Sequence, residues 1–105
     1  MTKSDVIEKL ESLKPMLQAE GFEVLGLFGS FARGDFSDSS DIDILYTLSN
    51  PHEFVRKNGG FGALTKIRET KEFLANAFGR GVDFVDESAL SRTGKKYILG
   101  DLLHV

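Results

Sequence analysis

Residues 23–47 read EVLGLFGSFARGDFSDSSDIDILYT, two apolar segments joined by a glycine-bounded turn and an acidic loop. The first segment, residues 23–28, is apolar after its opening glutamate, which is typical of a buried strand. The second, residues 41–47, alternates acidic and apolar side chains at its start, as a strand with one buried face does. Gly29 and Gly34 bound a segment that is long enough for a single helical turn. The stretch therefore predicts strand, turn, polar loop and strand in that order.

The chain before this stretch predicts a helix. Its apolar residues recur three or four positions apart: Ile7, Leu10, Leu13 and Leu17. Ser4 and Asp5 are good starting residues for a helix, and Gly21 is a good ending residue. Proline lacks the amide hydrogen that a helix interior needs, so Pro15 predicts a break or kink near residue 14.

The chain after this stretch predicts a second helix and a third strand. Residues 49–52 and 57–60 are rich in turn-forming residues, and we expect a turn and then a flexible loop there. An apolar stripe over residues 63–78 predicts a helix closed by Gly79. Residues 81–86 predict the third strand.

A last helix follows. Either Ser88 or Ser91 could cap it, and its apolar residues are Tyr97, Ile98, Leu102 and Leu103. Helices and strands thus alternate along the chain, which predicts an α/β (α+β) domain with a small sheet covered by helices. The length of 105 residues is that of one domain, so we expect residues 1–105 to form a single domain.

Composition excludes several kinds of site. There is no cysteine, so disulfides and thiolate catalysis are excluded, and two histidines are too few for a multi-histidine metal site. The net charge is −3, and residues 21–50 hold five acidic residues against one basic residue. Such a chain has no broad basic face for duplex nucleic acid. Its start is charged and no apolar run reaches membrane length, so we expect a cytoplasmic protein without a membrane partner.

Asp41 and Asp43 are the sharpest chemical feature. Side chains alternate along a strand, so both carboxylates project from one face while Ile42 and Ile44 project from the other. Two carboxylates held so close repel each other, and a divalent cation between them would remove that repulsion. Oxygen ligands suit Mg²⁺ or Mn²⁺. The plain alternative is the polar face of a half-exposed strand, although aspartate is disfavoured in strands.

Gly29 and Ser30 follow the first strand directly. A glycine there lets the backbone approach a phosphate, and the turn can offer N–H groups and the Ser30 hydroxyl. An ordinary connection between strand and turn is the alternative. Neither a Gly-x-x-x-x-Gly-Lys nor a Gly-x-Gly-x-x-Gly pattern occurs, so P-loop and dinucleotide-binding sites are excluded.

Taken together, the Gly29-Ser30 pair, ten intervening residues and the Asp41-Ile-Asp43 triplet resemble the signature of the DNA-polymerase-β-type nucleotidyltransferase superfamily. More narrowly, GSFARG (29–34) with SDIDIL (40–45) is similar to the minimal nucleotidyltransferases (MNT), small prokaryotic proteins reduced to the catalytic core. The motif spans residues 28–45, and the order of elements matches over essentially the whole chain. The resemblance implies the nucleotidyltransferase fold, a small mixed β-sheet flanked by helices.

The resemblance also implies roles for individual residues. Gly29 and Ser30 would hold the β- and γ-phosphates of a nucleoside triphosphate. Asp41 and Asp43 would be catalytic and would ligate two Mg²⁺ ions, for which Mn²⁺ could substitute. The motif does not decide the role of Arg33. It could contact a phosphate or the acidic surface of a partner, or form an ion pair with a neighbouring loop acid, Asp35 or Asp38.

A third carboxylate of the family comes from a later strand and matches Asp83. It would ligate the catalytic metal and help to deprotonate the acceptor hydroxyl. Asp86 is a rival, but strand alternation turns it to the opposite face from Asp83. Ser40 could bind nucleotide, orient Asp41 through a bond within the loop, or simply belong to the turn.

Other residues are weaker candidates. We expect ordinary exposed positions for His52 and His104, and packing positions for Tyr46 and Tyr97. A basic cluster is more typical of a solvated helix face than of a binding patch: Arg92, Lys95 and Lys96. Residues 59–62 could form a mobile flap near the nucleotide or merely a connector.

The resemblance implies an enzyme that moves a nucleoside monophosphate, AMP from ATP, to a hydroxyl group. Minimal nucleotidyltransferases are commonly the antitoxin half of a HEPN–MNT toxin–antitoxin pair, and in that family they can adenylylate a tyrosine of the HEPN ribonuclease. A chain this short would receive its acceptor from a partner protein. Two alternatives stay open: a non-catalytic antitoxin that neutralises a HEPN partner by contact alone, and a small-molecule nucleotidyltransferase, which usually carries an extra helical domain.

Overall fold

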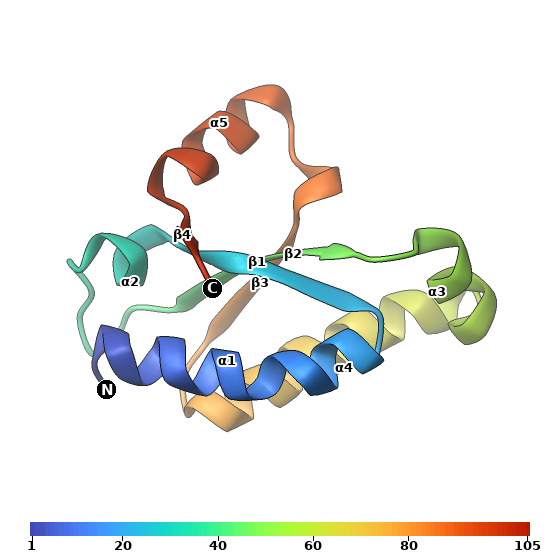
Figure 1. Cartoon of the computed structure of the whole chain (residues 1–105), viewed down its shortest axis with the longest axis horizontal. Coiled ribbons are helices and arrows are strands. Elements are labelled where there is room, and N and C mark those ends of the chain that lie inside the picture. Colours follow the sequence, from blue (N-terminus) through green and yellow to red (C-terminus); the bar gives the residue numbers. More distant parts are fainter.

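A four-stranded mixed sheet forms the centre of the computed structural model, which describes all 105 residues (Figure 1). β1 (Phe22–Phe28) and β2 (Ile42–Leu48) are antiparallel, and β3 (Val82–Asp86) runs parallel to β2. β4 (Leu103–His104) pairs antiparallel with the other edge of β1, which gives the order β3-β2-β1-β4. The expected small mixed sheet is confirmed.

Two long helices cover one face of this sheet. α1 (Lys3–Ala19) packs on β1 and α4 (Gly60–Phe78) packs on β3, and both lie on the same side in Figure 1. α5 (Arg92–Asp101) lies on the opposite side. The single turn expected after β1 is present as α2 (Gly29–Arg33). The sheet therefore has one face with full helical cover and one with less.

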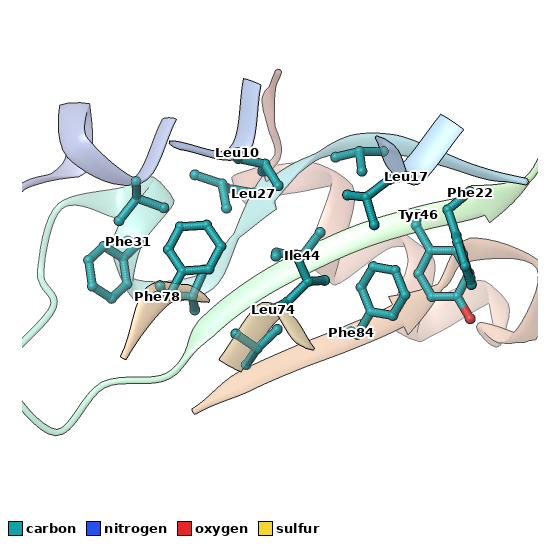
Figure 2. Packing of buried hydrophobic residues seen from close by; sticks show 14 of the residues in the cluster. Leu10, Leu17, Phe22, Leu27, Phe31, Ile44, Tyr46, Leu74, Phe78 and Phe84 are labelled. Carbon is teal, nitrogen blue, oxygen red and sulfur yellow. The ribbon is translucent and has the colours of Figure 1, made fainter. Parts of the chain in front are cut away.

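The hydrophobic core lies between the sheet and the two long helices. Alternate side chains of β2 point into it, since Ile42, Ile44 and Tyr46 are all buried there. The ring of Tyr46 stacks on that of Phe84 with 3.9 Å between centroids, and it meets the Phe22 ring edge-on at 5.4 Å (Figure 2). Aromatic packing thus ties the three longer strands together on the α1 and α4 face.

The opposite face of β2 carries Asp43 and Leu45, because side chains alternate along a strand. Leu45 is fully buried yet lies outside the main core cluster. A short 3-10 turn, Glu87–Ala89, contacts β2 and lies on the α5 side of the sheet. The partly covered face is therefore the one that presents an aspartate.

α1 runs unbroken through Pro15, so the expected break near residue 14 is wrong. The helix is capped by Thr2, whose Oγ1 accepts the Asp5 N–H at 3.1 Å while Asp5 Oδ2 accepts the Thr2 N–H at 2.8 Å. Leu10 and Leu17 lie on either side of the proline, and both are fully buried in the core. Burial on both halves of the helix outweighs the hydrogen bond that proline cannot make.

A helix that the sequence did not predict, α3 (Pro51–Asn58), follows β2. The side chain of Asn50 caps it by accepting an N–H at 3.1 Å, and Phe54 anchors it in the core. Gly59 alone joins α3 to α4. The flexible loop expected at residues 57–60 is therefore wrong, because residues 57 and 58 end α3 and Gly60 begins α4. Within residues 59–62, Gly59 is a connector and the other three residues form the first turn of α4.

The C-terminal part of the chain folds back onto β1. Of the two candidate serines, Ser91 caps α5 by accepting the Gly94 N–H at 3.1 Å. The helix ends at Asp101, and Leu103 lies in β4 rather than on the helix. β4 can approach β1 because Gly26 has no side chain, and a Cβ there would overlap the Leu103 carbonyl oxygen.

The two tyrosines differ in their surroundings. Tyr46 is 2% exposed and its burial raises its pKa to about 12, so the expected packing role is confirmed. Tyr97 on α5 is 80% exposed, so the packing role expected for it is wrong. α5 buries none of its residues completely, which leaves the outer side of this helix to solvent. No helix of the protein has both the length and the apolar character needed to cross a membrane.

Candidate active site

Three parts of the chain meet at one end of the sheet. β1 ends there, and β2 and β3 begin there, because β2 and β3 are parallel and β1 runs against them. The strand register pairs Phe28 with Asp43, and Asp43 with Asp83. Gly29 and Ser30 follow Phe28 directly. The fold therefore brings the glycine turn, Asp41 and Asp43 at the start of β2, and Asp83 of β3 to one edge.

Asp41 and Asp83 place negative charge beside Asp43 at this edge. Asp43 is half-buried, while Asp41 and Asp83 are exposed. Burial, and after it the negative charges of Asp83 and Asp41, raises the pKa of Asp43 to about 6, while the charge of Arg33 acts in the opposite direction. Ionised Asp43 is thus held among like charges, an arrangement that a bound cation would stabilise.

Two glycines let these carboxylates lie against the backbone. Gly29 has a φ of +72°, and a Cβ there would overlap Asp43 Oδ2. A Cβ at Gly81, just before β3, would overlap Asp41 Oδ1. The Gly81 carbonyl also accepts the Ile42 N–H at 2.9 Å, which extends the pairing of β2 and β3 back to the level of Asp41. A side chain at either glycine would displace a carboxylate.

α2 fixes the glycine turn beside these carboxylates. The Ser30 carbonyl accepts the N–H groups of Gly34 and Asp35 at 2.8 and 3.1 Å, which closes the turn. Gly34 ends the helix in the left-handed conformation, with a φ of +88°. Phe31 is fully buried and anchors the turn in the core. The position of Ser30 is therefore set by bonds within the turn and by packing beneath it.

Arg33 forms two ion pairs, with Asp35 Oδ2 at 3.1 Å and with Asp101 Oδ2 at 2.9 Å. The pair with Asp35 is one of the two that the sequence suggested, and Asp38 takes no part. The pair with Asp101 joins α2 to the end of α5, and no sequence pattern indicated it. These side chains are largely exposed, so the pairs contribute little to stability.

The loop before β2 is held by hydrogen bonds to its backbone. Ser40 Oγ accepts the Ser37 N–H at 2.9 Å. Arg80 Nη1 donates to the carbonyls of Ser37 and Ser40 at 3.2 and 3.0 Å. Sequence reasoning missed Arg80, because a single arginine before a strand carries no motif and its partners lie 43 and 40 residues away.

The remaining candidates lie outside this edge. Asp86 Oδ1 accepts the N–H and the hydroxyl of Ser88 at 2.9 and 2.8 Å, so it caps the 3-10 turn. Its charge helps to raise the pKa of Tyr46, in line with the expectation that it faces away from Asp83. The two histidines and the basic cluster are all exposed, on α3, β4 and α5: His52, His104, Arg92, Lys95 and Lys96.

The chemistry of the aspartate set suits a hard divalent cation. All of its donors are carboxylate oxygens, the ligands that Mg²⁺ and Mn²⁺ prefer, and a cation would offset the repulsion that acts on Asp43. No three His, Cys, Asp or Glu side chains converge on a common point in this structure. Asp41, Asp43 and Asp83 would hold such an ion at this edge once their side chains turn toward a common point.

The class of protein follows from a comparison with known families. The family described as nucleotidyltransferase domain matches residues 5–102, nearly the whole chain. The protein therefore belongs to the nucleotidyltransferase family, and it is a nucleotidyltransferase.

Individual relatives refine this class. The protein adenylyltransferase MntA of Thermococcus cleftensis is 29% identical over 104 residues, which cover 94% of this chain and 95% of the relative. A solved structure of a candidate minimal nucleotidyltransferase has a TM-score of 0.78 at 22% identity, over 100% of this chain and 97% of its own. A toxin–antitoxin structure with AMP-PNP has a TM-score of 0.53 at 24% identity, over 87% of this chain and 61% of its own. The resemblance to minimal nucleotidyltransferases, in sequence and in fold, is confirmed.

Proposed function

We propose that this protein transfers AMP from ATP to a hydroxyl group of a partner protein, with Mg²⁺ as its cofactor. The observation that carries the proposal is the register pair of Asp43 and Asp83, which lies beside Asp41 and the turn at Gly29. Membership of the nucleotidyltransferase family supplies the class of reaction. The name of the MntA relative, a protein adenylyltransferase, supports a protein as the acceptor.

The aspartates of the sheet edge would bind the cofactor. Asp41, Asp43 and Asp83 would hold two Mg²⁺ ions, for which Mn²⁺ could substitute. Bound cations would neutralise charge on the triphosphate and on the departing pyrophosphate. Gly29 and Ser30, next to Asp43, would hold the β- and γ-phosphates.

Two further residues would contact the nucleotide. Arg33 would exchange one of its two aspartate partners for a phosphate oxygen, since both pairs are solvent-accessible and weak. Ser40 would lie beside the nucleotide on the loop that leads to Asp41. Neither contribution needs a change of the backbone, because both side chains are at the surface of the site.

The reaction is an in-line displacement at the α-phosphorus. A bond forms between the acceptor oxygen and the α-phosphorus while the bond to the bridging oxygen breaks, and pyrophosphate leaves. Asp83 would accept the proton of the acceptor hydroxyl, because it is exposed on an edge strand where an acceptor can approach. The other residues act by holding the reacting groups in line.

The acceptor that we infer is a tyrosine of a HEPN ribonuclease toxin, so that the protein would act as an antitoxin. A toxin–antitoxin structure with AMP-PNP, an analogue of ATP, shares this fold, which supports both an adenine nucleotide and a toxin partner. The aspartates lie on the face of the sheet with less helical cover, so a side chain of a partner can reach them.

Incubation with Mg²⁺, α-labelled ATP and the protein product of the neighbouring gene tests the proposal. We expect label on the partner, and none with the Asp41→Asn/Asp43→Asn variant. Asp38→Asn is the matched control, because it removes an acid from the neighbouring loop whose side chain has no part in the site. This control should label the partner as the wild type does.

Two results would replace the proposal. Toxin neutralisation through a stable complex, without label and unchanged in the double variant, would establish a non-catalytic antitoxin. Consumption of ATP with a small hydroxylated compound, and label on neither protein, would establish a small-molecule nucleotidyltransferase. Label on a partner residue other than tyrosine, found by mass spectrometry, would keep the enzyme and correct the acceptor.

A further inference from the structure

We propose that Arg80 is a positioning residue, which holds Asp41 in place through the backbone on either side of it. Arg80 is half-buried at the end of the segment that follows α4, and it belongs to none of the five ion pairs of the structure. Its guanidinium is directed at main-chain oxygens and at an aromatic ring instead. Its donors are therefore used within the protein rather than left free for a phosphate. We call the dipeptide of Arg80 and Gly81 the clamp.

The first contact of the clamp is with the loop that leads into β2. Arg80 Nη1 donates to the carbonyl oxygens of Ser37 and Ser40, at 3.2 and 3.0 Å. Ser40 directly precedes Asp41, so the second of these bonds fixes the peptide group on the N-terminal side of the aspartate. A hydrogen bond from a charged donor is stronger than one between neutral groups.

The second contact is with the peptide group on the other side of Asp41. Gly81, the residue after Arg80, accepts the Ile42 N–H at 2.9 Å. The dipeptide of Arg80 and Gly81 therefore bonds both peptide groups that flank Asp41. Gly81 also lacks the Cβ that would overlap Asp41 Oδ1, so the side chain of Asp41 lies against this same dipeptide.

The third contact joins the clamp to the glycine turn. The Arg80 guanidinium lies over the ring of Phe31, 5.0 Å from its centroid. Phe31 is fully buried in α2 and stacks on Phe36 of the loop at 4.1 Å. One side chain thus contacts α2 and the loop before β2, and its residue lies two positions before β3, the strand that carries Asp83. These are the three segments that meet at the candidate site.

The role rests on the proposed function, because it matters for catalysis only if Asp41 binds metal. The loop of residues 35–40 buries no residue completely, and Asp41 is exposed. Without the clamp, Asp41 would move relative to Asp43 and bind the cation less well. Loss of groups that orient metal ligands typically weakens metal binding by about tenfold to a hundredfold.

Two substitutions at Arg80 test the role. Arg80→Met keeps an unbranched apolar chain over Phe31 but removes the donors, while Arg80→Lys keeps a donor without the planar guanidinium. We expect Arg80→Met to raise the dissociation constant for Mn²⁺, measured by water-proton relaxation without nucleotide, by about tenfold or more. Amide hydrogen exchange of residues 37–42 should be faster in the same variant. Arg80→Lys should recover part of both effects.

Controls separate positioning from loss of charge or of stability. Arg68→Met removes an exposed arginine from α4 and should leave Mn²⁺ binding and exchange unchanged. Leu74→Val weakens the core under α4, and at matched destabilisation it should leave Mn²⁺ binding unchanged.

Two results would overturn the role: unchanged exchange at residues 37–42 in Arg80→Met, or the same loss of Mn²⁺ binding in Leu74→Val. Asp41→Asn tests the proposed function separately. One outcome is that this variant binds Mn²⁺ and transfers AMP like the wild type, while Arg80→Met still speeds amide exchange. In that case Arg80 holds the backbone around Asp41, but Asp41 is not a metal ligand.

Discussion

Asp43 is the residue at which the stability of the protein and its proposed function conflict. Its pKa rises from 3.8 to about 6, because of burial first and then of the charges of Asp83 and Asp41. The folded protein therefore binds the Asp43 proton more tightly than the unfolded chain does, so the ionised form destabilises the fold. This penalty is fully present above the folded pKa of about 6 and disappears as the pH falls towards 3.8.

Asp43→Asn should therefore stabilise the metal-free protein at mildly alkaline pH while it abolishes nucleotidyl transfer. After allowance for solvent screening of a partly exposed carboxylate, we expect a gain of about 1 kcal/mol. That corresponds to roughly 5 °C in melting temperature for a chain of this size. Thermal denaturation in the presence of a chelator measures it, and the gain should vanish near pH 4. Asp38→Asn should show no such gain, and a variant less stable than the wild type in alkali would contradict the prediction.

Gly29 and Gly34 make a matched pair, because both have a positive φ, of +72° and +88°, and they bound the same turn. Only Gly29 faces a carboxylate, since a Cβ at Gly34 would meet nothing within 4 Å. Gly34→Ala should cost about 1 kcal/mol of stability through its left-handed backbone, with little effect on activity. Gly29→Ala should carry the same strain and also displace Asp43, which should lower kcat/KM by about a hundredfold. Steady-state kinetics well below both melting temperatures tests this, and an equal loss of activity in the two variants would refute it.

At the scale of the elements, Pro15 shows that packing can override local preference. It lies inside α1, where it removes one hydrogen bond, yet the helix continues. Pro15→Ala restores the missing donor and should stabilise the protein by about 2 kcal/mol, somewhat below the full helix preference because the unfolded chain also becomes more flexible. Chemical denaturation measures the change. Activity should stay at the wild-type level, because α1 covers the face of the sheet away from Asp43. Pro15 is exposed, so a loss of stability would mean that proline stabilises the protein more by restricting the unfolded chain than it destabilises the helix.

The sequence predicted the helices and strands whose own side chains form a regular pattern of apolar and polar residues. β2 begins with a regular alternation of acidic and apolar residues, and α4 has an apolar stripe. α3 is eight residues long and buries one of them, Phe54, and the residues at its start, Asn50 and Pro51, predict a turn rather than a helix cap. β4 is two residues long and forms because Gly26 leaves room for it, a condition that involves a distant part of the chain.

At the scale of the whole molecule, the candidate site also combines features that have a local sequence pattern with features that depend on distant contacts. The glycine turn and the aspartate pair could be predicted because they lie together in residues 28–45, and Asp83 followed from the resemblance. The pair of Arg33 with Asp101 and the bond of Arg80 to Ser40 join residues 68 and 40 positions apart. Such contacts have no local signal, so they become visible only once the sheet has brought the segments together.

The charge of the whole molecule leads to a last prediction. The protein has a net charge of −3, and three of its aspartates interact at the edge where a triphosphate would bind. A nucleoside triphosphate alone would meet repulsion there, whereas a divalent cation would be attracted both to the aspartates and to the phosphates. Nucleotide and metal should therefore bind together, each increasing the affinity for the other by the same factor.

An ATP analogue with a methylene group between the α- and β-phosphates tests this without turnover. At a concentration of about a hundred times its dissociation constant it should stabilise the protein by roughly 2.7 kcal/mol in the presence of Mg²⁺, or about 12 °C in melting temperature. With a chelator in place of Mg²⁺ the shift should nearly vanish. Asp41→Asn/Asp43→Asn should show a small shift under both conditions, because the variant loses the metal ligands and the repulsion together. An equally large shift with chelator in the wild type would mean that Gly29, Ser30 and Arg33 bind the triphosphate by themselves, and the acidic edge would then need another explanation.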